Sequence, residues 1–410
     1  MRRSALAILL ALAFPSPAVA MIGLGIADSD SATFSDPAWP GLNVRLVRAV
    51  APWDVALTDP AAGTPAGDRR AEFDRWVAGA AAVGARPLVT FEQSLDPARP
   101  GAPSLDDYTA AMRAFAATYP SVRDVAPWNE PNFRDPAVNP YLDRPADAAA
   151  LWGALSAACP DCTVAAGEFA GIPGDPYVAA YRAALGTAQP AVWSFHAHLD
   201  TSDPTAPATR FFLGALPPDA RLWIDEAGSY FRDATGAIRG DAAQRAGVSL
   251  LLGLPAIGPR IARIYYYNLD NQCSTAARCA VQDRGLVAPS PFDGSALDYD
   301  VAGRVRPAYA VVRDRGPVAV PAAPRGFGLR VTPRARAVRP GRAARFVVRV
   351  TPPGSVALRV RGARVAAARL PAVWVRAARP GRHRVTVTAE SAGTRRRARV
   401  VLVVRAGPRY

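Results

Sequence analysis

The sequence predicts a (β/α)8 barrel, or TIM barrel, of the α/β class, followed by a small all-β immunoglobulin-like sandwich. Short apolar runs alternate with helical stretches through residues 21–315, and there are eight such runs. From about residue 328 the hydrophobic period changes to two, and turn sequences divide the chain into short segments. With 410 residues, half of them apolar and a fifth charged, the chain is long enough for one large barrel and a module.

The eight runs are apolar nearly throughout, as expected of parallel strands buried on both faces. They are 22–27, 44–50, 86–91, 125–129, 163–167, 192–197, 221–225 and 261–268. Alanine-rich helical patterns lie between them at 72–83, 105–119, 146–158 and 242–252, and Ser104, with Asp107 three residues later, predicts a helix N-cap. Eight such units match the barrel. A doubly wound open sheet is the alternative, but no G-x-G-x-x-G motif follows the first run.

The C-terminal part of the chain predicts a separate module. Residues 316–327 are rich in proline, glycine and alanine and predict a linker. Strand-like runs follow at 328–332, 344–350, 356–360, 372–375, 383–388 and 398–404. Short strands at this spacing indicate an immunoglobulin-like β-sandwich over 328–410, with arginine at many alternate positions.

The N-terminus predicts a signal peptide over residues 1–20. Arg2 and Arg3 precede an apolar stretch, 5–14, that is too short to span a bilayer, and Ala18-Val19-Ala20 fits the small-x-small cleavage rule. We therefore expect cleavage after Ala20 and a secreted, extracellular protein, with an uncleaved anchor as the alternative. No later stretch approaches the length of a membrane span, so no integral membrane span is expected.

The net charge of +15 is concentrated at one end of the chain. All 49 basic residues are arginine. Residues 316–410 hold 22 of them with one acid, Glu390, a net charge of +21, whereas residues 1–315 carry −6. Because the barrel is mildly acidic, no nucleic-acid partner is expected. The module is a candidate for binding an anionic surface such as cell-wall polymer, or is a spacer with a solvated arginine surface.

The four cysteines form two local pairs, Cys159 with Cys162 and Cys273 with Cys279. In an exported protein such pairs predict two local disulfides. The sequence C-P-D-C also resembles a thioredoxin-type redox motif, and four cysteines could bind zinc. The predicted barrel places the two pairs at opposite ends, which argues against a shared site.

Two glutamates follow predicted strands at the end of the barrel where catalytic residues emerge. Glu130 ends the fourth strand in Ala126-Pro-Trp-Asn-Glu-Pro-Asn132, and Glu226 ends the seventh in Leu222-Trp-Ile-Asp-Glu-Ala-Gly228. Glycosidic cleavage needs two carboxyl groups, one protonated to assist the leaving oxygen and one ionised to attack the anomeric carbon. The pattern therefore favours a glycosidase over a pair of ordinary surface acids.

Trp128-Asn129-Glu130-Pro131-Asn132 resembles the motif of clan A glycoside hydrolases of the family 39 and family 5 types, and the resemblance extends over most of the barrel. It implies that Glu130 is the general acid/base, Glu226 the nucleophile, and Asn129 a hydrogen-bond partner of the sugar 2-hydroxyl. It also implies retention of anomeric configuration. Arg48 corresponds to an arginine that steadies the nucleophile, with Arg45 as the competing candidate.

The sixth strand, Ser194-Phe-His-Ala-His198, matches the clan at His196 and departs from it at His198, where a tyrosine that touches the nucleophile is usual. Trp53 and Tyr267 are the expected sugar-stacking aromatics, and Tyr267 stands where the clan often has tryptophan. Two histidines two residues apart could bind a metal, but no clear third ligand appears. We expect no metal and no other cofactor.

Other acids lie near strand ends. Glu92, Glu168 and Asp28 are expected to line the rim or a subsite, and strand alternation predicts that Asp225 points out of the barrel. The whole pattern predicts a secreted retaining glycoside hydrolase that acts on an oligo- or polysaccharide. The alternatives are a non-catalytic carbohydrate-binding or cell-wall-associated barrel, and an adhesion protein in which the sandwich is the active part.

Overall fold

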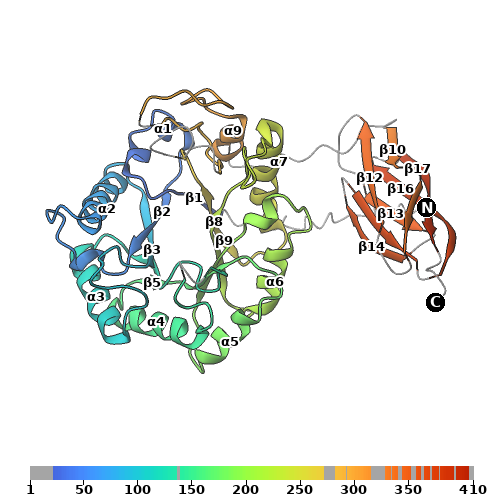
Figure 1. Ribbon diagram of the computed structural model, residues 1–410. Helices are drawn as coiled ribbons and strands as arrows, with labels where there is room; N and C mark the ends of the chain where they lie inside the picture. Colours follow the sequence, from blue (N-terminus) through green and yellow to red (C-terminus); the bar gives the residue numbers. More distant parts are fainter. Residues whose placement is uncertain are drawn as a thin grey trace, which may run out of the picture. The chain divides into compact units, whose positions relative to one another are not determined.

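The computed structural model describes residues 22–135, 139–271, 282–291, 293–314 and 328–405, except 334, 340–343, 352–356, 362–363, 370–371, 378 and 392–393. The chain divides between Val318 and Ala319 into two compact units (Figure 1). The predicted signal peptide and the predicted linker 316–327 lie outside the described residues.

The first unit is a parallel sheet wound into a barrel, with helices around it (Figure 1). Its strands are β1 (Gly23–Ala27), β2 (Leu46–Pro52), β3 (Arg86–Glu92), β4 (Asp124–Ala126), β5 (Thr163–Val164), β6 (Ala166–Ala170), β7 (Val192–His196), β8 (Arg221–Ala227) and β9 (Ile261–Tyr267). Their order is β5-β4-β3-β2-β1-β9-β8-β7-β6. Only Ala165 separates β5 from β6, so one run of chain pairs with both β4 and β7 and nearly closes the sheet. The predicted TIM-like α/β barrel of eight strand runs is thereby confirmed.

The outer helices follow the strands. They are α1 (Trp39–Leu42), α2 (Pro65–Ala82), α3 (Leu105–Thr118), α4 (Pro145–Ala158), α5 (Pro176–Ala184), α6 (Pro207–Ala215), α7 (Gly240–Gly253) and α9 (Pro307–Arg313). Ser104 caps α3 as predicted, because its Oγ accepts the Asp107 amide at 3.1 Å. Helix α2 begins seven residues before the expected start, since Thr64 caps it and Pro65 occupies the first helical position.

The helices cover the outside of the sheet with large apolar side chains. Phe73 and Trp76 of α2 and Phe115 of α3 are at most 2 % exposed and belong to the main core cluster. Among the described residues no helix is both long and apolar enough to cross a membrane.

The structure contains one of the two predicted disulfides. Cys159, directly after α4, is bonded to Cys162, just before β5. Cys273 and Cys279 both lie outside the described residues. The disulfide between Cys273 and Cys279 therefore stays a prediction. Their placement at the carboxyl end of the barrel also stays a prediction.

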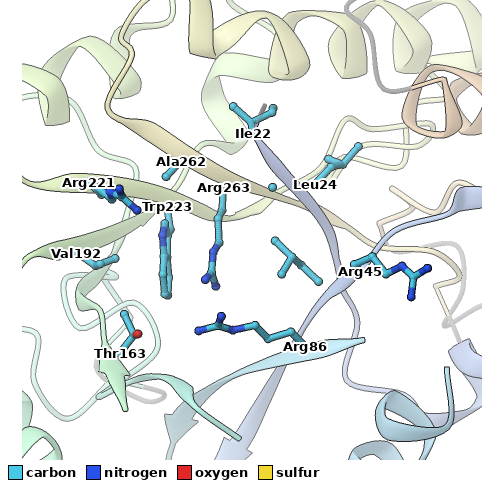
Figure 2. Close-up of a pocket in the computed structure, with 12 residues that line it drawn as sticks. Ile22, Leu24, Arg45, Arg86, Thr163, Val192, Arg221, Trp223, Ala262 and Arg263 are labelled. Carbon is cyan, nitrogen blue, oxygen red and sulfur yellow. The ribbon is translucent and has the colours of Figure 1, made fainter. Parts of the chain in front are cut away.

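At the amino ends of the strands the barrel has a cavity of about 540 Å³ lined by four arginines (Figure 2). Buried Asp124 accepts two hydrogen bonds from Arg86 and one from Arg263, each 2.6 Å long, and Arg263 lies 3.9 Å over the ring of Trp223. This network ties β3, β4 and β9 together at the face of a barrel that usually serves stability. Arg45 lines the same cavity, so it lies far from the carboxyl ends of the strands.

The second unit consists of two four-stranded sheets. One has the order β10 (Gly328–Thr332), β12 (Ala344–Thr351), β15 (Ala372–Arg376), β14 (Arg364–Arg369), and the other β11 (Ala335–Val338), β17 (Thr394–Val404), β16 (Gly381–Ser391), β13 (Ala357–Arg361). Phe346, Val387 and Leu402 form part of its own core. All six predicted runs are strands. β11 and β14 were not predicted, because both contain several alanines and arginines, which are not typical strand residues.

A buried ion pair near α9 provides a test of the barrel's stability. Arg306 forms two hydrogen bonds to Asp283, of 2.5 and 2.7 Å, and both side chains are fully buried. Arg306→Met should lower the free energy of unfolding by about 3–5 kcal/mol, because Asp283 would remain buried without its main cation. Urea denaturation followed by tryptophan fluorescence measures this free energy. The signal reports mainly on the barrel, because seven of the eight tryptophans precede residue 318.

The control is Arg313→Met, which removes an exposed arginine of the same helix and should leave the free energy of unfolding almost unchanged. Equal effects of the two substitutions would show that the buried pair has no special role.

Candidate active site

The site lies at the carboxyl ends of the barrel strands, where β2, β4, β7 and β8 bring side chains together. Glu130 follows β4 and adopts a left-handed backbone conformation, with φ of +44°. Its amide donates to the carbonyl of Glu168 at 3.0 Å, and the Asn129 amide donates to the carbonyl of Phe91 at 2.8 Å. Both neighbouring strands therefore fix the Asn129-Glu130 segment, and such uncommon backbone conformations cluster at functional sites.

Arg48 of β2 lies at the centre of the site and is only 2 % exposed. Its Nη1 donates to Glu226 Oε2 at 2.7 Å, its Nη2 to Asn129 Oδ1 at 2.9 Å, and its Nε to Glu168 Oε1 at 3.1 Å. The planar guanidinium has fixed donor directions, so these contacts set the relative positions of three strand ends. Arg48, rather than Arg45, is the arginine of the site.

His196, at the end of β7, contacts the other glutamate. Its Nδ1 lies 2.7 Å from Glu130 Oε1, and its Nε2 lies 3.4 Å from Arg48 Nη2. Burial lowers the pKa of His196, but the negative charges of Glu226 and Glu130 and the hydrogen bond to Glu130 outweigh it and raise this pKa to about 9. The His196 ring is therefore a cation at neutral pH.

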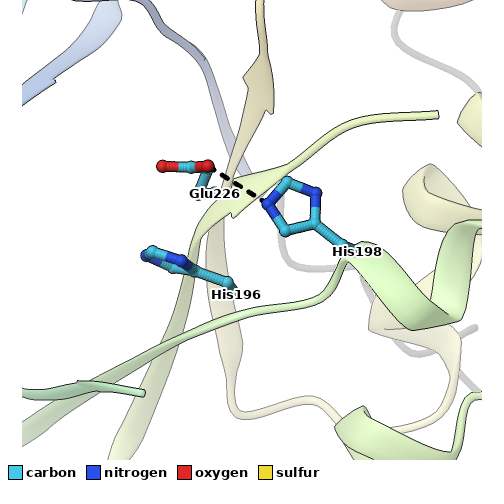
Figure 3. A group of neighbouring side chains, drawn as sticks. All are labelled: His196, His198 and Glu226. Carbon is cyan, nitrogen blue, oxygen red and sulfur yellow. Dashed lines mark hydrogen bonds and ion pairs between the residues drawn. The ribbon is translucent and has the colours of Figure 1, made fainter. Parts of the chain in front are cut away.

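His198 contacts Glu226, as the dashed line in Figure 3 shows. The Gly228 amide donates to His198 Nδ1 at 3.1 Å, so the ring proton must be on Nε2, which donates to Glu226 Oε1 at 3.1 Å. Burial, together with the nearby charge of Arg284, lowers the pKa of His198. A neutral imidazole thus donates to Glu226.

Glu226 is held as a carboxylate. Burial alone would raise its pKa, but His196, the hydrogen bond from His198 and the charge of Arg48 together hold the pKa well below its usual range. Each of its two oxygens has a donor, and the side chain is 15 % exposed. An ionised and partly accessible carboxylate with fixed orientation can act as a nucleophile or stabilise a cation.

The prediction that Asp225 points out of the barrel is wrong. In the pairing of β7 with β8, Phe195 faces Ile224, but the next residue, His196, faces Glu226. Asp225 is therefore an extra residue in a β-bulge, which breaks the alternation of side chains. The side chain is fully buried, and its Oδ1 lies 3.8 Å from His196 Nε2.

A second register shift, between Gly167 and Phe169, directs Glu168 inward as well. Glu168 has φ of +58°, is fully buried, accepts the bond from Arg48 and contacts the Thr90 hydroxyl. It is not a rim residue as predicted but a component of the charged centre. The sequence gives no signal for this role beyond the position near a strand end.

The remaining predicted residues lie around this centre. Trp53 is 4 % exposed and belongs to the hydrophobic core, and it also lines a cavity of about 240 Å³. Tyr267 is partly buried, with its ring 6.2 Å from that of His198, and lines a cavity of about 470 Å³ together with Asp28. Burial raises the pKa of Asp28 to about 7. Glu92 is half-buried at the end of β3.

In the part of the chain that the structure describes, two groups of side chains have ligand atoms within 4.8 Å of one another. One is His196, His198 and Glu226, and the other is Glu168, His196 and Asp225. The Arg48 guanidinium, however, donates to both Glu226 and Glu168 and would repel a metal ion between them. Both nitrogens of His198 already have partners. The donor set therefore does not fit a metal.

No protein-family model matches the sequence, and no curated protein matches it. Among solved structures, an endo-beta-1,4-mannanase from Thermotoga petrophila is similar with 10 % identity and a TM-score of 0.47, over 94 % of this chain and 98 % of that one. A beta-glucosidase, number 1317, has 14 % identity and a TM-score of 0.46 over 69 % and 86 % of the two chains. A GH113 beta-1,4-mannanase has 14 % identity and a TM-score of 0.43, over 72 % of this chain and 98 % of that one. Scores this low define neither a family nor an activity.

The two histidines of the site should titrate differently. We expect the His196 ring to lose its proton near pH 9, whereas His198 is already neutral at pH 7, with its proton on Nε2. Nitrogen-15 NMR of the imidazoles measures both, and the chain has only three histidines. A neutral His196 at pH 7 would contradict the charge distribution of the site.

Proposed function

We propose that the protein is a retaining glycoside hydrolase, with Glu226 as nucleophile and Glu130 as general acid/base. The observation that carries this proposal is that two glutamates at one end of the barrel have different hydrogen-bond partners and different electrostatic environments. Arg48 and His198 hold Glu226 as a carboxylate, while Glu130 has His196 beside it. Unequal environments for two carboxyl groups are what acid/base and nucleophile roles require.

In the proposed reaction Glu226 attacks the anomeric carbon while Glu130 donates its proton to the departing oxygen, which breaks the glycosidic bond and forms a glycosyl ester on Glu226. Glu130 then accepts a proton from water, the water oxygen attacks the anomeric carbon, and Glu226 leaves as a carboxylate. His196 lies 2.7 Å from Glu130 and stabilises its ionised form during the second step. Asn129, held by Arg48, is the proposed partner of the sugar 2-hydroxyl. The substrate class is an oligo- or polysaccharide.

Removal of the nucleophile gives the sharpest result. Glu226→Ala should reduce kcat at least about 10³-fold on aryl glycosides, because the first bond to carbon cannot form. Added azide should restore turnover and give a glycosyl azide of inverted configuration, as NMR of the product shows. Asp106→Ala, an exposed acid on α3, is the control. Near-normal activity of Glu226→Ala would remove the assignment.

Removal of the acid/base should depend on the leaving group. Glu130→Ala should slow glycosides with poor leaving groups far more than activated aryl glycosides, since an activated group departs with little protonation. Comparison of kcat/KM across a series of phenols measures this. An equal loss for all leaving groups would assign Glu130 to another role.

A second candidate function is carbohydrate binding without turnover. It is favoured by the low exposure of Trp53, which is only 4 % and leaves little of its ring for stacking on a sugar. Glycan binding by the wild-type protein, with no release of reducing sugar from aryl glycosides or polysaccharides, would favour this function.

We infer that the chain is secreted and that its second unit is an immunoglobulin-like module. The signal-peptide pattern of residues 1–20 supports secretion. The sheet orders β10-β12-β15-β14 and β11-β17-β16-β13 support the module, because they correspond to strands ABED and GFC of an immunoglobulin sandwich, with β11 as an added parallel edge strand.

The charge of the module predicts its partner. With a net charge of +21 over residues 316–410, it should retain the protein on anionic cell-wall polymer. The retained fraction should fall steeply between 0.01 and 0.15 M salt, as the Debye length shrinks from about 30 to about 8 Å. A chain ending at Val318 should keep its activity on a small glycoside and lose retention in a sedimentation assay. Equal sedimentation of both chains at low salt would exclude this role.

A further inference from the structure

Beneath Glu226 the described part of the barrel contains three carboxylate oxygens with no hydrogen-bond partner. They are both oxygens of Asp225 and Oε2 of Glu168. Both side chains are fully buried, and buried polar atoms in proteins almost always have partners. Three such oxygens in one place therefore need a physical explanation.

Two ionised carboxylates do not explain this arrangement, because neither oxygen of Asp225 has a donor within hydrogen-bond distance. The groups that face it are Glu168 from β6, His196 from β7, Arg48 from β2 and Tyr265 from β9, with Glu226 next to it in β8. Arg48 directs its hydrogen bonds to Glu168, Glu226 and Asn129, and the 3.8 Å from His196 Nε2 to Asp225 is too long for a hydrogen bond. An ionised Asp225 would be a buried charge without a hydrogen bond, which is strongly unfavourable.

We propose that Asp225 and Glu168 hold one proton between them at neutral pH, which makes Asp225 a neutral positioning residue beneath the charged centre. Asp225 and Glu168 lie close enough for a side-chain hydrogen bond, and two carboxyl groups can form one only when one of them carries a proton. Burial, with the charge of Glu168 next to it, raises the pKa of Asp225 well above its ordinary value. Arg48 donates to Glu168 and not to Asp225, so the proposal places the proton on Asp225.

The proton balances the charges of the site. Arg48 and His196 are then matched by Glu226 and Glu168, and the site is neutral when Glu130 carries its proton. The positive charge of His196 then interacts with Glu130 and Glu226 and not with a charged Asp225. This consequence rests on the proposed glycosidase function, whereas the position of the proton does not.

Imidazole NMR of the full chain tests the position of the proton without a substrate. Asn has the shape of a protonated Asp, so Asp225→Asn should leave the pKa of His196 within about half a unit of the wild-type value. Glu130→Gln, which removes an ionisable partner at 2.7 Å, should lower it by at least one unit and is the positive control. A fall of more than one unit in Asp225→Asn would show that Asp225 is ionised, and would overturn the proposal.

A second measurement, the pH dependence of stability, is needed because local rearrangement around the new amide would also change the pKa of His196. The unfolded chain ionises Asp225 near pH 4, while the folded chain keeps the proton to a much higher pH. The stability that the raised pKa provides is thus complete below pH 4 and is lost as the pH rises. From pH 4.5 to 7.5 the unfolding equilibrium constant of the wild type should rise about tenfold per pH unit relative to that of Asp225→Asn.

Urea denaturation at several pH values gives these ratios. Asp106→Asn, at an exposed site on α3, is the matched control and should show a constant ratio to the wild type. A constant ratio for Asp225→Asn would overturn the proposal, as would a ratio that changes in the opposite direction. A protein that binds glycans without turnover would still give a clear answer in both measurements, so failure of the proposed function and failure of this proposal are distinguishable.

Discussion

The buried guanidinium of Arg48 is the interaction on which the site depends. It reaches Glu226, Asn129 and Glu168 with three separate donors, and these residues come from or directly follow β8, β4 and β6. Burial of an ion pair adds little to stability, because the loss of hydration offsets the attraction. Its effect here is positional: the two proposed catalytic segments are fixed relative to one cation, and Glu226 is held ionised in a place that would otherwise favour its neutral form.

The two histidines of the site contact different glutamates and differ in charge. His198 is neutral and donates to Glu226, whereas His196 is a cation beside Glu130. The difference follows from their partners: a backbone amide and Arg284 surround His198, and carboxylates surround His196. Two identical side chains two residues apart thus support two different glutamates, as the proposed double displacement requires.

Strand periodicity and turn sequences were sufficient to predict the barrel, the second all-β unit and the strand ends that carry Glu130 and Glu226. They failed where the backbone departs from regular pairing. The bulge at Asp225 and the left-handed conformation of Glu168 turn both side chains inward, and neither is visible in a pattern of period two. Tertiary position also separated Arg48 from Arg45, three residues apart in sequence and at opposite ends of the barrel, and placed Trp53 in the core.

Trapping of the covalent intermediate tests the central claim most directly. The full chain would be incubated with a panel of 2-deoxy-2-fluoro glycosides that carry activated leaving groups, and then digested and analysed by mass spectrometry. The account predicts one glycosyl group per chain, attached to the carboxylate of Glu226 and absent from Glu226→Ala. Turnover of a glycoside with the label on another residue would contradict it, and so would hydrolysis with inversion and no label.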